Sequence, residues 1–183
     1  MTTTRIAKII LLVEDQTTES LLRRYLQRLG DDNRNIRVRR IQDGRGSGEQ
    51  FVRERYASEV RVLRTSHTKA CLIVSIDADT KTTSERRQQL ERALRDAEEP
   101  AREARERILN LVPKRNIETW ILCLNSAADD ETTDYRHDSR VDPKSIRSAA
   151  QALYAWTRPN ALIPDICVAS LTECLPEFDR IPE

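Results

Sequence analysis

Two short apolar segments that each end in acidic residues constrain this chain more than any other feature. Residues 9–13 (Ile-Ile-Leu-Leu-Val) run directly into Glu14-Asp15, and residues 71–76 (Cys-Leu-Ile-Val-Ser-Ile) run directly into Asp77-Ala78-Asp79. Apolar runs of this length that precede helical patterns are typical of buried parallel strands. In open α/β sheets the ligand crevice lies beyond the carboxyl ends of such strands. We therefore expect these acids to converge on one edge of a sheet.

Acids gathered at one edge predict a site for a divalent cation. Carboxylates repel one another unless a cation neutralises them, and hard oxygen ligands suit Mg²⁺ or Mn²⁺. Alternate residues of one strand point the same way, so Asp77 and Asp79 are expected to face a single ion together with Glu14. The alternative is that Glu14 and Asp79 cap the following helices, which stabilises a helix by about 0.5–2 kcal/mol. A cap needs one acid, so the paired acids favour the metal.

The rest of the pattern completes an α/β domain. Strands are expected at 8–13, 36–41, 71–76 and 108–112, and helices at 21–29, 47–63, 82–107 (broken at Pro100), 116–124, 143–156 and 168–175. Strands that alternate with helices fit a mostly parallel sheet with helices on both faces. We expect residues 1–125 to form this domain, and residues 126–183 to form an acidic, mobile loop and a small helical C-terminal extension packed on it.

Three of the four glycines lie within residues 44–48. So dense a cluster implies a backbone that needs positive φ or a close approach to another group. Ser47 and Gln50 fit a capping box at the start of the following helix. A glycine-rich loop that leads into a helix can also bind an anion. A plain loop with a helix cap is favoured over a phosphate site, because the loop matches neither GxGxxG nor the P-loop pattern.

The charges of the chain nearly cancel, with 31 basic and 30 acidic residues, but they are unevenly distributed. Nine arginines and four acids lie between residues 34 and 64. Arginine suits phosphate groups, so a basic face could follow a nucleic-acid backbone, and an ordinary solvated surface is an equal alternative. The residues expected to contact nucleic acid are Arg37, Arg39, Arg45, Lys81 and Arg115.

The cysteine spacing and the amino-terminal sequence indicate the cellular compartment in which we expect this protein. The four cysteines form no CxxC pair and no metal-ligand spacing, which is typical of a reduced protein without a disulfide framework. The apolar stretch near the amino terminus is too short for a signal peptide and ends in acids. No window is long enough for a membrane-spanning helix. We expect a cytoplasmic protein that does not contact a membrane.

The order of these motifs resembles the Toprim fold. Leu11-Leu12-Val13-Glu14 followed later by Ile76-Asp77-Ala78-Asp79 resembles the catalytic module of topoisomerases, primases, overcoming-lysogenization-defect nucleases and small maturation RNases. The segment 112–122, Val-Pro-Lys-Arg-Asn-Ile-Glu-Thr-Trp-Ile-Leu, is similar to the Pro-x-x-x-Ile-Glu-x-Trp segment of small Toprim-like proteins found near phage-defence genes. The resemblance covers residues 6–125 and leaves the acidic loop and the tail outside.

The resemblance implies a role for each matching acid. Glu14 would act as general acid/base or as a further metal ligand, and Asp77 and Asp79 would bind Mg²⁺. Lys114 would stabilise the transition state, and Glu118 would complete the metal shell. The chain departs from the family pattern at Asp15, which replaces a glycine, and at Glu19, which lies one place late and is not expected to bind metal.

The resemblance therefore implies a metal-dependent nuclease that uses Mg²⁺ or Mn²⁺ on DNA or RNA, as the effector of an antiviral defence system. Its partners would include a separate ATPase or regulatory protein, and a homo-oligomer is compatible with the sequence. A non-catalytic subunit that binds nucleic acid or a partner ATPase is the main alternative. A receiver-like signalling domain is weaker, because Pro113-Lys114 reverses the order typical of receivers and Asp77-Ala78-Asp79 comes late for one.

Overall fold

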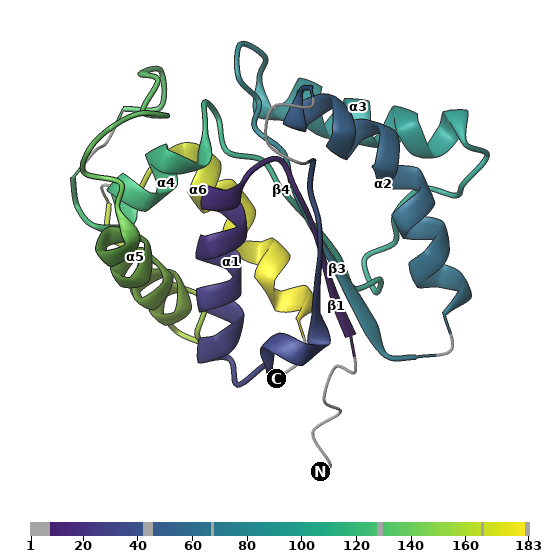
Figure 1. Ribbon diagram of the computed structural model, residues 1–183, viewed down its shortest axis with the longest axis horizontal. Helices are drawn as coiled ribbons and strands as arrows, with labels where there is room; N and C mark the ends of the chain where they lie inside the picture. Colours follow the sequence, from purple (N-terminus) through teal and green to yellow (C-terminus); the bar gives the residue numbers. More distant parts are fainter. Residues whose placement is uncertain (1–7, 42–45, 67, 128–129, 166, 182–183) are drawn as a thin grey trace.

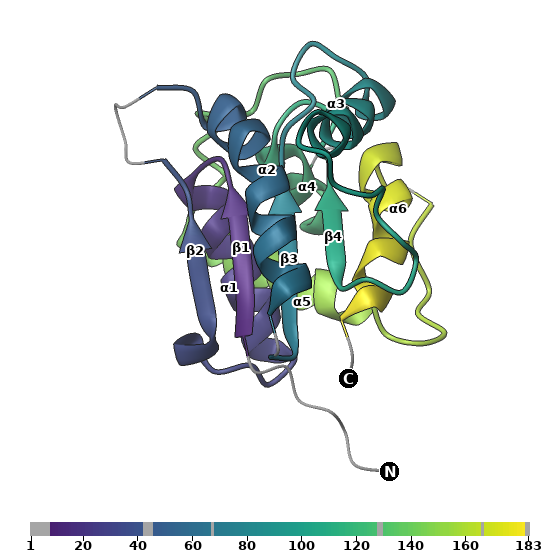
Figure 2. The same cartoon turned by 90° about the vertical axis from the view of Figure 1, so that its right-hand side faces the viewer.

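Four parallel strands form the centre of the molecule. The computed structural model describes residues 8–41, 46–66, 68–127, 130–165 and 167–181. The strands are β1 (Lys8–Val13), β2 (Ile36–Arg39), β3 (Ala70–Ser75) and β4 (Ile108–Leu111). They form one sheet in the order β2-β1-β3-β4, and every neighbouring pair is parallel. Figure 2 shows the four arrows pointing toward the same edge. The predicted α/β class is confirmed.

Helices cover both faces of this sheet (Figure 1). One face carries α1 (Gln16–Arg28), α4 (Ile117–Leu124), α5 (Pro143–Trp156), α6 (Ala169–Cys174) and the 3₁₀-helix η2 (Leu175–Arg180). The other face carries α2 (Gly48–Thr65) and α3 (Thr83–Asp96), and a short 3₁₀-helix, η1 (Asn33–Asn35), precedes β2. No helix in the described ranges is long and apolar enough to cross a membrane.

The alternation of side chains along β1 builds two separate cores. Ile9, Leu11 and Val13 are buried on the side of α1, whereas Ile10 and Leu12 are buried on the side of α2. Successive strand residues point to opposite faces, so a strand covered on both sides is apolar throughout. This explains why the sequence shows a continuous apolar run rather than an alternating one.

The C-terminal helices share the core of the strands. Ile146, Ala149 and Leu153 of α5 are buried in the same cluster as β1, and Phe178 of η2 packs edge-on against Tyr25 with the ring centroids 5.0 Å apart. Helix α5 begins at Asp142, whose side chain accepts a hydrogen bond from the Ser145 amide in a capping box. The extension after residue 126 thus packs against the helices of the first part through apolar side chains.

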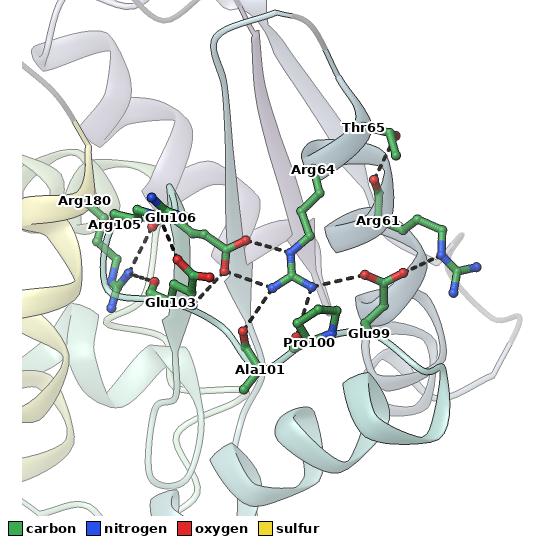
Figure 3. Close-up of polar contacts among 10 residues, drawn as sticks. All are labelled: Arg61, Arg64, Thr65, Glu99, Pro100, Ala101, Glu103, Arg105, Glu106 and Arg180. Atoms are coloured by element: carbon green, nitrogen blue, oxygen red, sulfur yellow. Dashed lines mark hydrogen bonds and ion pairs between the residues drawn. The ribbon is translucent and has the colours of Figure 1, made fainter.

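The highly charged stretch after Asp79 forms a shorter helix than its composition predicts. Helix α3 ends at Asp96, so the expected helix over 82–107 is wrong beyond that point. Glu98 has φ of 58°, a left-handed conformation that cannot continue the helix. Beyond it the chain is held by side chains. Arg64 of α2 donates to the carbonyl oxygens of Pro100 and Ala101 at 3.0 and 3.2 Å (Figure 3).

Other side chains complete this attachment. Arg64 also binds the carboxylates of Glu99 and Glu106 (Figure 3). Arg180 donates to the carbonyl oxygens of Glu103, Ala104 and Glu106. Acids and arginines that looked like a solvated helix face therefore fix an irregular segment against α2 and the C-terminal end of η2. Amino-acid composition cannot distinguish a solvated helix from an irregular segment held by ion pairs, because both have balanced charges at the surface.

The strand order gives the sheet one topological switch point, between β1 and β3. The chain leaves β1 through α1 on one face and returns to β3 through α2 on the other face. In doubly wound sheets the carboxyl ends of the two strands at this point open a crevice that binds ligands. Glu14 follows β1 and Asp77 lies two residues after β3, so both acids lie at this switch point.

Candidate functional site

Glu14 and Asp77 meet at the switch point. The last residues of their strands, Val13 and Ser75, are paired in register. The Glu14 carboxylate accepts a hydrogen bond from the Asp77 amide at 2.6 Å. The backbone of Ala78 donates to the carbonyl oxygen of Pro113 at 2.8 Å, which extends the contact between the β3 and β4 ends. The expected convergence of Glu14 with the Asp77 loop at one edge is therefore present.

Asp79 reaches this edge by a different route from the one predicted. Strand β3 ends at Ser75, and Asp79 has a left-handed φ of 54°. Alternate residues of a strand point the same way, but that rule does not apply to a turn. Asp77 is buried with an exposed fraction of 3%, whereas the Asp79 side chain is 32% exposed. The expectation that both acids project together from one strand is wrong.

Two further acids lie at the same edge. Asp15 is the N-cap of α1, where its carboxylate accepts a hydrogen bond from the Thr18 amide at 2.8 Å. Glu118 lies in the first turn of α4, which Asn116 caps, and its exposed fraction is 4%. One carboxylate oxygen of Glu118, Oε2, is buried and has no hydrogen-bond partner within the described residues. Such an oxygen is costly to bury unless something binds it.

The pKa values of these acids are raised because they are buried together. Burial raises the pKa of Glu14 to about 8; the bond from the Asp77 amide opposes this, and the nearby charges of Asp79 and Asp15 add to it. Burial, and then the charge of Glu14, raises the pKa of Asp77 well above its usual range. Burial, with the charge of Asp15, raises the pKa of Glu118 to about 7. Without a cation Glu14 and Glu118 keep their protons to a higher pH than ordinary glutamates, and a bound cation would favour the ionised forms of all three acids.

Two arginines that the sequence reasoning missed lie at this edge. Arg86 of α3 is buried beneath the Asp77 loop, where its Nε donates to the Asp77 carbonyl oxygen at 2.8 Å and another nitrogen binds Glu49. Arg136 binds Asp79, with Nη2 and Oδ1 2.6 Å apart. Arg86 lies in a run that reads as a solvated helix, and Arg136 lies in an acidic segment that reads as a mobile loop. Neither carries a spacing signal that could have revealed it.

The glycine-rich loop packs directly against Glu14. A Cβ atom built on Gly48 would lie 2.7 Å from the Glu14 carbonyl oxygen and 2.9 Å from its Cβ. Gly46 has φ of 121°, so both reasons for the glycines apply in the described part of the loop. The Ser47 side chain accepts a hydrogen bond from the Gln50 amide at 3.4 Å, which confirms the helix cap, but the Gln50 side chain donates to Glu54, so the expected capping box is only half formed. Gly44 lies outside the described residues.

The predicted basic residues take different positions. Lys114 donates to the carbonyl oxygen of Lys81 at 2.6 Å and makes no contact with an acid of the site in the described residues. Arg115 lies 3.6 Å from the carboxylate of Asp134. The bond from Lys114 to the Lys81 carbonyl oxygen links two loops, so Lys114 does not lie beside the carboxylates.

The basic residues of the edge strand β2 are also placed by the structure. Arg39 lies 3.2 Å from Glu59 of α2, and Arg37 is exposed. Arg45 lies outside the described residues. Glu19, which was not expected to bind metal, binds Arg23 and Arg40 at 2.8 and 2.9 Å.

The donor set fits a hard divalent cation in its chemistry. Glu14, Asp15, Asp77, Asp79 and Glu118 offer oxygen atoms alone, which Mg²⁺ and Mn²⁺ prefer. As the side chains lie, no group of three or more His, Cys, Asp or Glu residues in the described ranges has the geometry of a metal site. Asp79 binds Arg136 instead, so metal binding would require this carboxylate to turn away from the guanidinium.

Comparison with protein-family models, with curated proteins and with solved structures found no match. The class that the fold defines is a doubly wound α/β domain in which two buried acids, Glu14 and Asp77, meet at the switch point. The resemblance to Toprim proteins stays a prediction from the sequence motifs.

Proposed function

We propose that this protein is a Mg²⁺- or Mn²⁺-dependent nuclease of the Toprim type that hydrolyses phosphodiester bonds in DNA or RNA. The observation that carries the proposal is the buried Glu118 Oε2, which lacks a partner within the described residues and belongs to a carboxyl group whose charge raises the pKa of Asp77. Buried polar groups are normally satisfied, and an orphaned carboxylate oxygen in an acidic crevice points to a missing cation.

The residues of the site suit this chemistry. Asp77, Asp79 and Glu118 would hold the metal, which when bound polarises the phosphate and makes water more acidic. Glu14 would transfer the proton, because burial raises its pKa to about 8 without metal and a bound cation would lower it from there toward neutral pH. Arg86 would hold the Asp77 backbone in place from below through its bond to the carbonyl oxygen. Lys114 would order the loop that carries Lys81.

The proposal is tested by cleavage of plasmid DNA, single-stranded DNA and total tRNA with Mg²⁺, Mn²⁺ or EDTA. Asp77→Asn keeps the shape of the side chain and removes its charge. Glu19→Gln is the matched control, because Glu19 is an acid of the same region that binds two arginines. The expected result is cleavage with metal by wild type and Glu19→Gln. Asp77→Asn should lose more than the roughly 10–100-fold that removal of an outer-shell partner costs.

Two results would contradict the nuclease. One is cleavage that persists in EDTA, and the other is cleavage by Asp77→Asn at the wild-type rate. The circular-dichroism spectra of both variants should match wild type, so that loss of the fold is not mistaken for loss of chemistry. In a defence system the nuclease would act with a separate ATPase or regulatory protein, which co-purification of the native complex would identify.

A non-catalytic subunit that binds nucleic acid or a partner ATPase is the second candidate. The observation that favours it is the ion pair between Arg136 and Asp79, which partly neutralises the acids without a metal. This candidate predicts a shift of labelled nucleic acid in a native gel by wild type and Asp77→Asn alike, with no cleavage of any substrate in the panel by well-folded protein.

The receiver-like alternative gains support from the strand order, which is that of doubly wound domains with a switch point between the first and third strands. It loses support at Asp77, the residue that would accept a phosphoryl group, because only 3% of this residue is exposed. Incubation with radiolabelled acetyl phosphate distinguishes it, because a receiver would become labelled and Asp77→Asn would not.

A further inference from the structure

Arg136 is the arginine that the fold places above the acidic crevice. Its guanidinium binds Asp79 through Nη2 alone, and its Nε and Nη1 make no hydrogen bond to any residue that the structure describes. The side chain is 45% exposed. A guanidinium has five N–H donors in a planar fork that matches phosphate oxygens. Arg136 therefore keeps donors available to solvent at the mouth of the site.

The segment that carries Arg136 is attached to the domain. Asp134 accepts hydrogen bonds from the Asn116 side chain at 2.7 Å and from the Arg136 amide at 3.1 Å. Asn116 is fully buried and caps α4, so the position of Arg136 is tied to the helix that carries Glu118.

A second attachment lies upstream in the same segment. Glu131 accepts a hydrogen bond from the Ser170 amide at 2.9 Å, and the Ser170 hydroxyl in turn accepts one from the Trp120 indole at 2.8 Å. Trp120 is a buried residue of α4. The segment expected to be a mobile acidic loop is thus bound to Asn116 at the start of α4 and to Ser170 of α6.

A nucleic-acid substrate needs a basic side chain near these acids, because its phosphate groups are negatively charged. A phosphodiester approaching Asp77, Asp79 and Glu118 is repelled by them, and a bound metal offsets only part of that repulsion. Arg86 is buried and engaged with the Asp77 carbonyl oxygen, so it cannot reach a substrate. Lys114 is engaged with the carbonyl oxygen of Lys81. Arg136 combines exposure, unused donors and contact with an acid of the site.

We propose that Arg136 is a phosphate-binding residue of this site, which neutralises Asp79 in the free protein and contacts a phosphate oxygen of the nucleic acid once a divalent metal occupies Asp79. The inference rests on the proposed function and adds to it a substrate-binding residue from outside the region of Toprim resemblance. One guanidinium therefore serves two states of the site, and metal binding at Asp79 makes it available to the substrate.

The test measures nucleic-acid binding and metal binding separately. Binding of a short labelled duplex or RNA, whichever the cleavage panel selects, is followed by fluorescence anisotropy in Ca²⁺ at several salt concentrations. Mn²⁺ binding is followed by electron paramagnetic resonance. Wild type is compared with Arg136→Gln, with Arg136→Lys, and with Arg140→Gln. Arg140 lies on the same segment but binds Asp138 and the Ala127 carbonyl oxygen instead of the site.

For Arg136→Gln we expect nucleic-acid affinity to fall several-fold and the slope of log affinity against log salt to become shallower by about 0.9 on duplex DNA, the value of one phosphate contact. Mn²⁺ affinity should be unchanged or higher, because a competing cation has been removed. Arg136→Lys should recover part of the salt slope, and Arg140→Gln should match wild type. A merely structural role would weaken metal and nucleic-acid binding together.

Three results would overturn the inference. The first is an Arg136→Gln salt slope equal to that of wild type. The second is a parallel loss of Mn²⁺ affinity in that variant. Either result leaves the nuclease proposal standing if wild type binds Mn²⁺ and cleaves. The third is a wild-type protein that binds no Mn²⁺, which refutes the metal site and this role of Arg136 with it.

Discussion

The buried acids of the crevice predict an unusual dependence of stability on pH in the absence of divalent metal. Several ion-paired carboxyl groups, such as Glu19, Glu49 and Glu177, have lowered pKa values and lose their stabilising effect as pH falls below about 4.5. Glu14 and Glu118 act in the opposite direction. We expect the free energy of unfolding to decrease as pH rises from about 5.5 to about 8.5 in EDTA.

The sign and the size follow from the pKa values. The pKa of Glu14 rises from 4.5 to about 8 on folding, and that of Glu118 from 4.5 to about 7. Between these values the folded state keeps protons that the unfolded state has released, so the free energy of unfolding falls with pH. Their contribution is complete below pH 4.5 and is lost by about pH 8. At about 1.4 kcal/mol per pKa unit the loss is on the order of a few kcal/mol, a large part of a typical domain's 5–15 kcal/mol.

Urea unfolding followed by circular dichroism at the two pH values in EDTA measures this loss. The double variant Glu14→Gln, Glu118→Gln should show a flatter profile, because neither amide titrates and the Glu14→Gln side chain can still accept the bond from the Asp77 amide. Added Mg²⁺ should stabilise wild type most at the higher pH, where the ligands are ionised. A wild-type midpoint that is constant or increases with pH would refute the reasoning.

Two further predictions concern stability away from the titrating groups. Gly48→Ala should cost about 1–3 kcal/mol and weaken cleavage, because its new Cβ would lie 2.7 Å from the Glu14 carbonyl oxygen. Gly30→Ala meets no atom within 4 Å but is strained by its φ of 92°, so it should cost about 1–2 kcal/mol and leave cleavage intact. Arg64→Ala should cost about 1–3 kcal/mol and speed trypsin cleavage within residues 97–107, whereas Arg61→Ala, at a side chain 57% exposed, should cost less than about 1 kcal/mol. Equal effects on cleavage in the glycine pair, or on stability in the arginine pair, would contradict the packing described.

The fold and the meeting of Glu14 with Asp77 were predictable because both depend on local patterns. An apolar run buried on both faces identifies a parallel strand, and the carboxyl ends of parallel strands share an edge. The helix over 143–156 was likewise predictable, because Asp142 and Pro143 are strong signals for the start of a helix and the structure begins α5 there.

Asp79 and Arg136 were not predictable for a physical reason. The direction of Asp79 depends on one left-handed residue after the strand, and an aspartate can adopt that conformation or an extended one without a change in sequence pattern. Arg136 reaches Asp79 from 57 residues along the chain through a segment without periodicity. Pro100 is a local signal for the end of α3, but the path of the chain after Asp96 depends on carbonyl groups bound by Arg64, a contact between segments that no local signal encodes.

The buried Arg86 links the two helices of one face to the floor of the crevice. Its guanidinium joins Glu49 of α2 to the carbonyl oxygen of Asp77, and its exposed fraction is 2%. Loss of one partner from a buried ion pair leaves an uncompensated charge, which typically costs 3–5 kcal/mol, whereas replacement of both by apolar residues can be neutral. In homologous sequences, substitutions at positions 49 and 86 should therefore occur together, and this co-variation would show that the ion pair is retained or replaced as a unit.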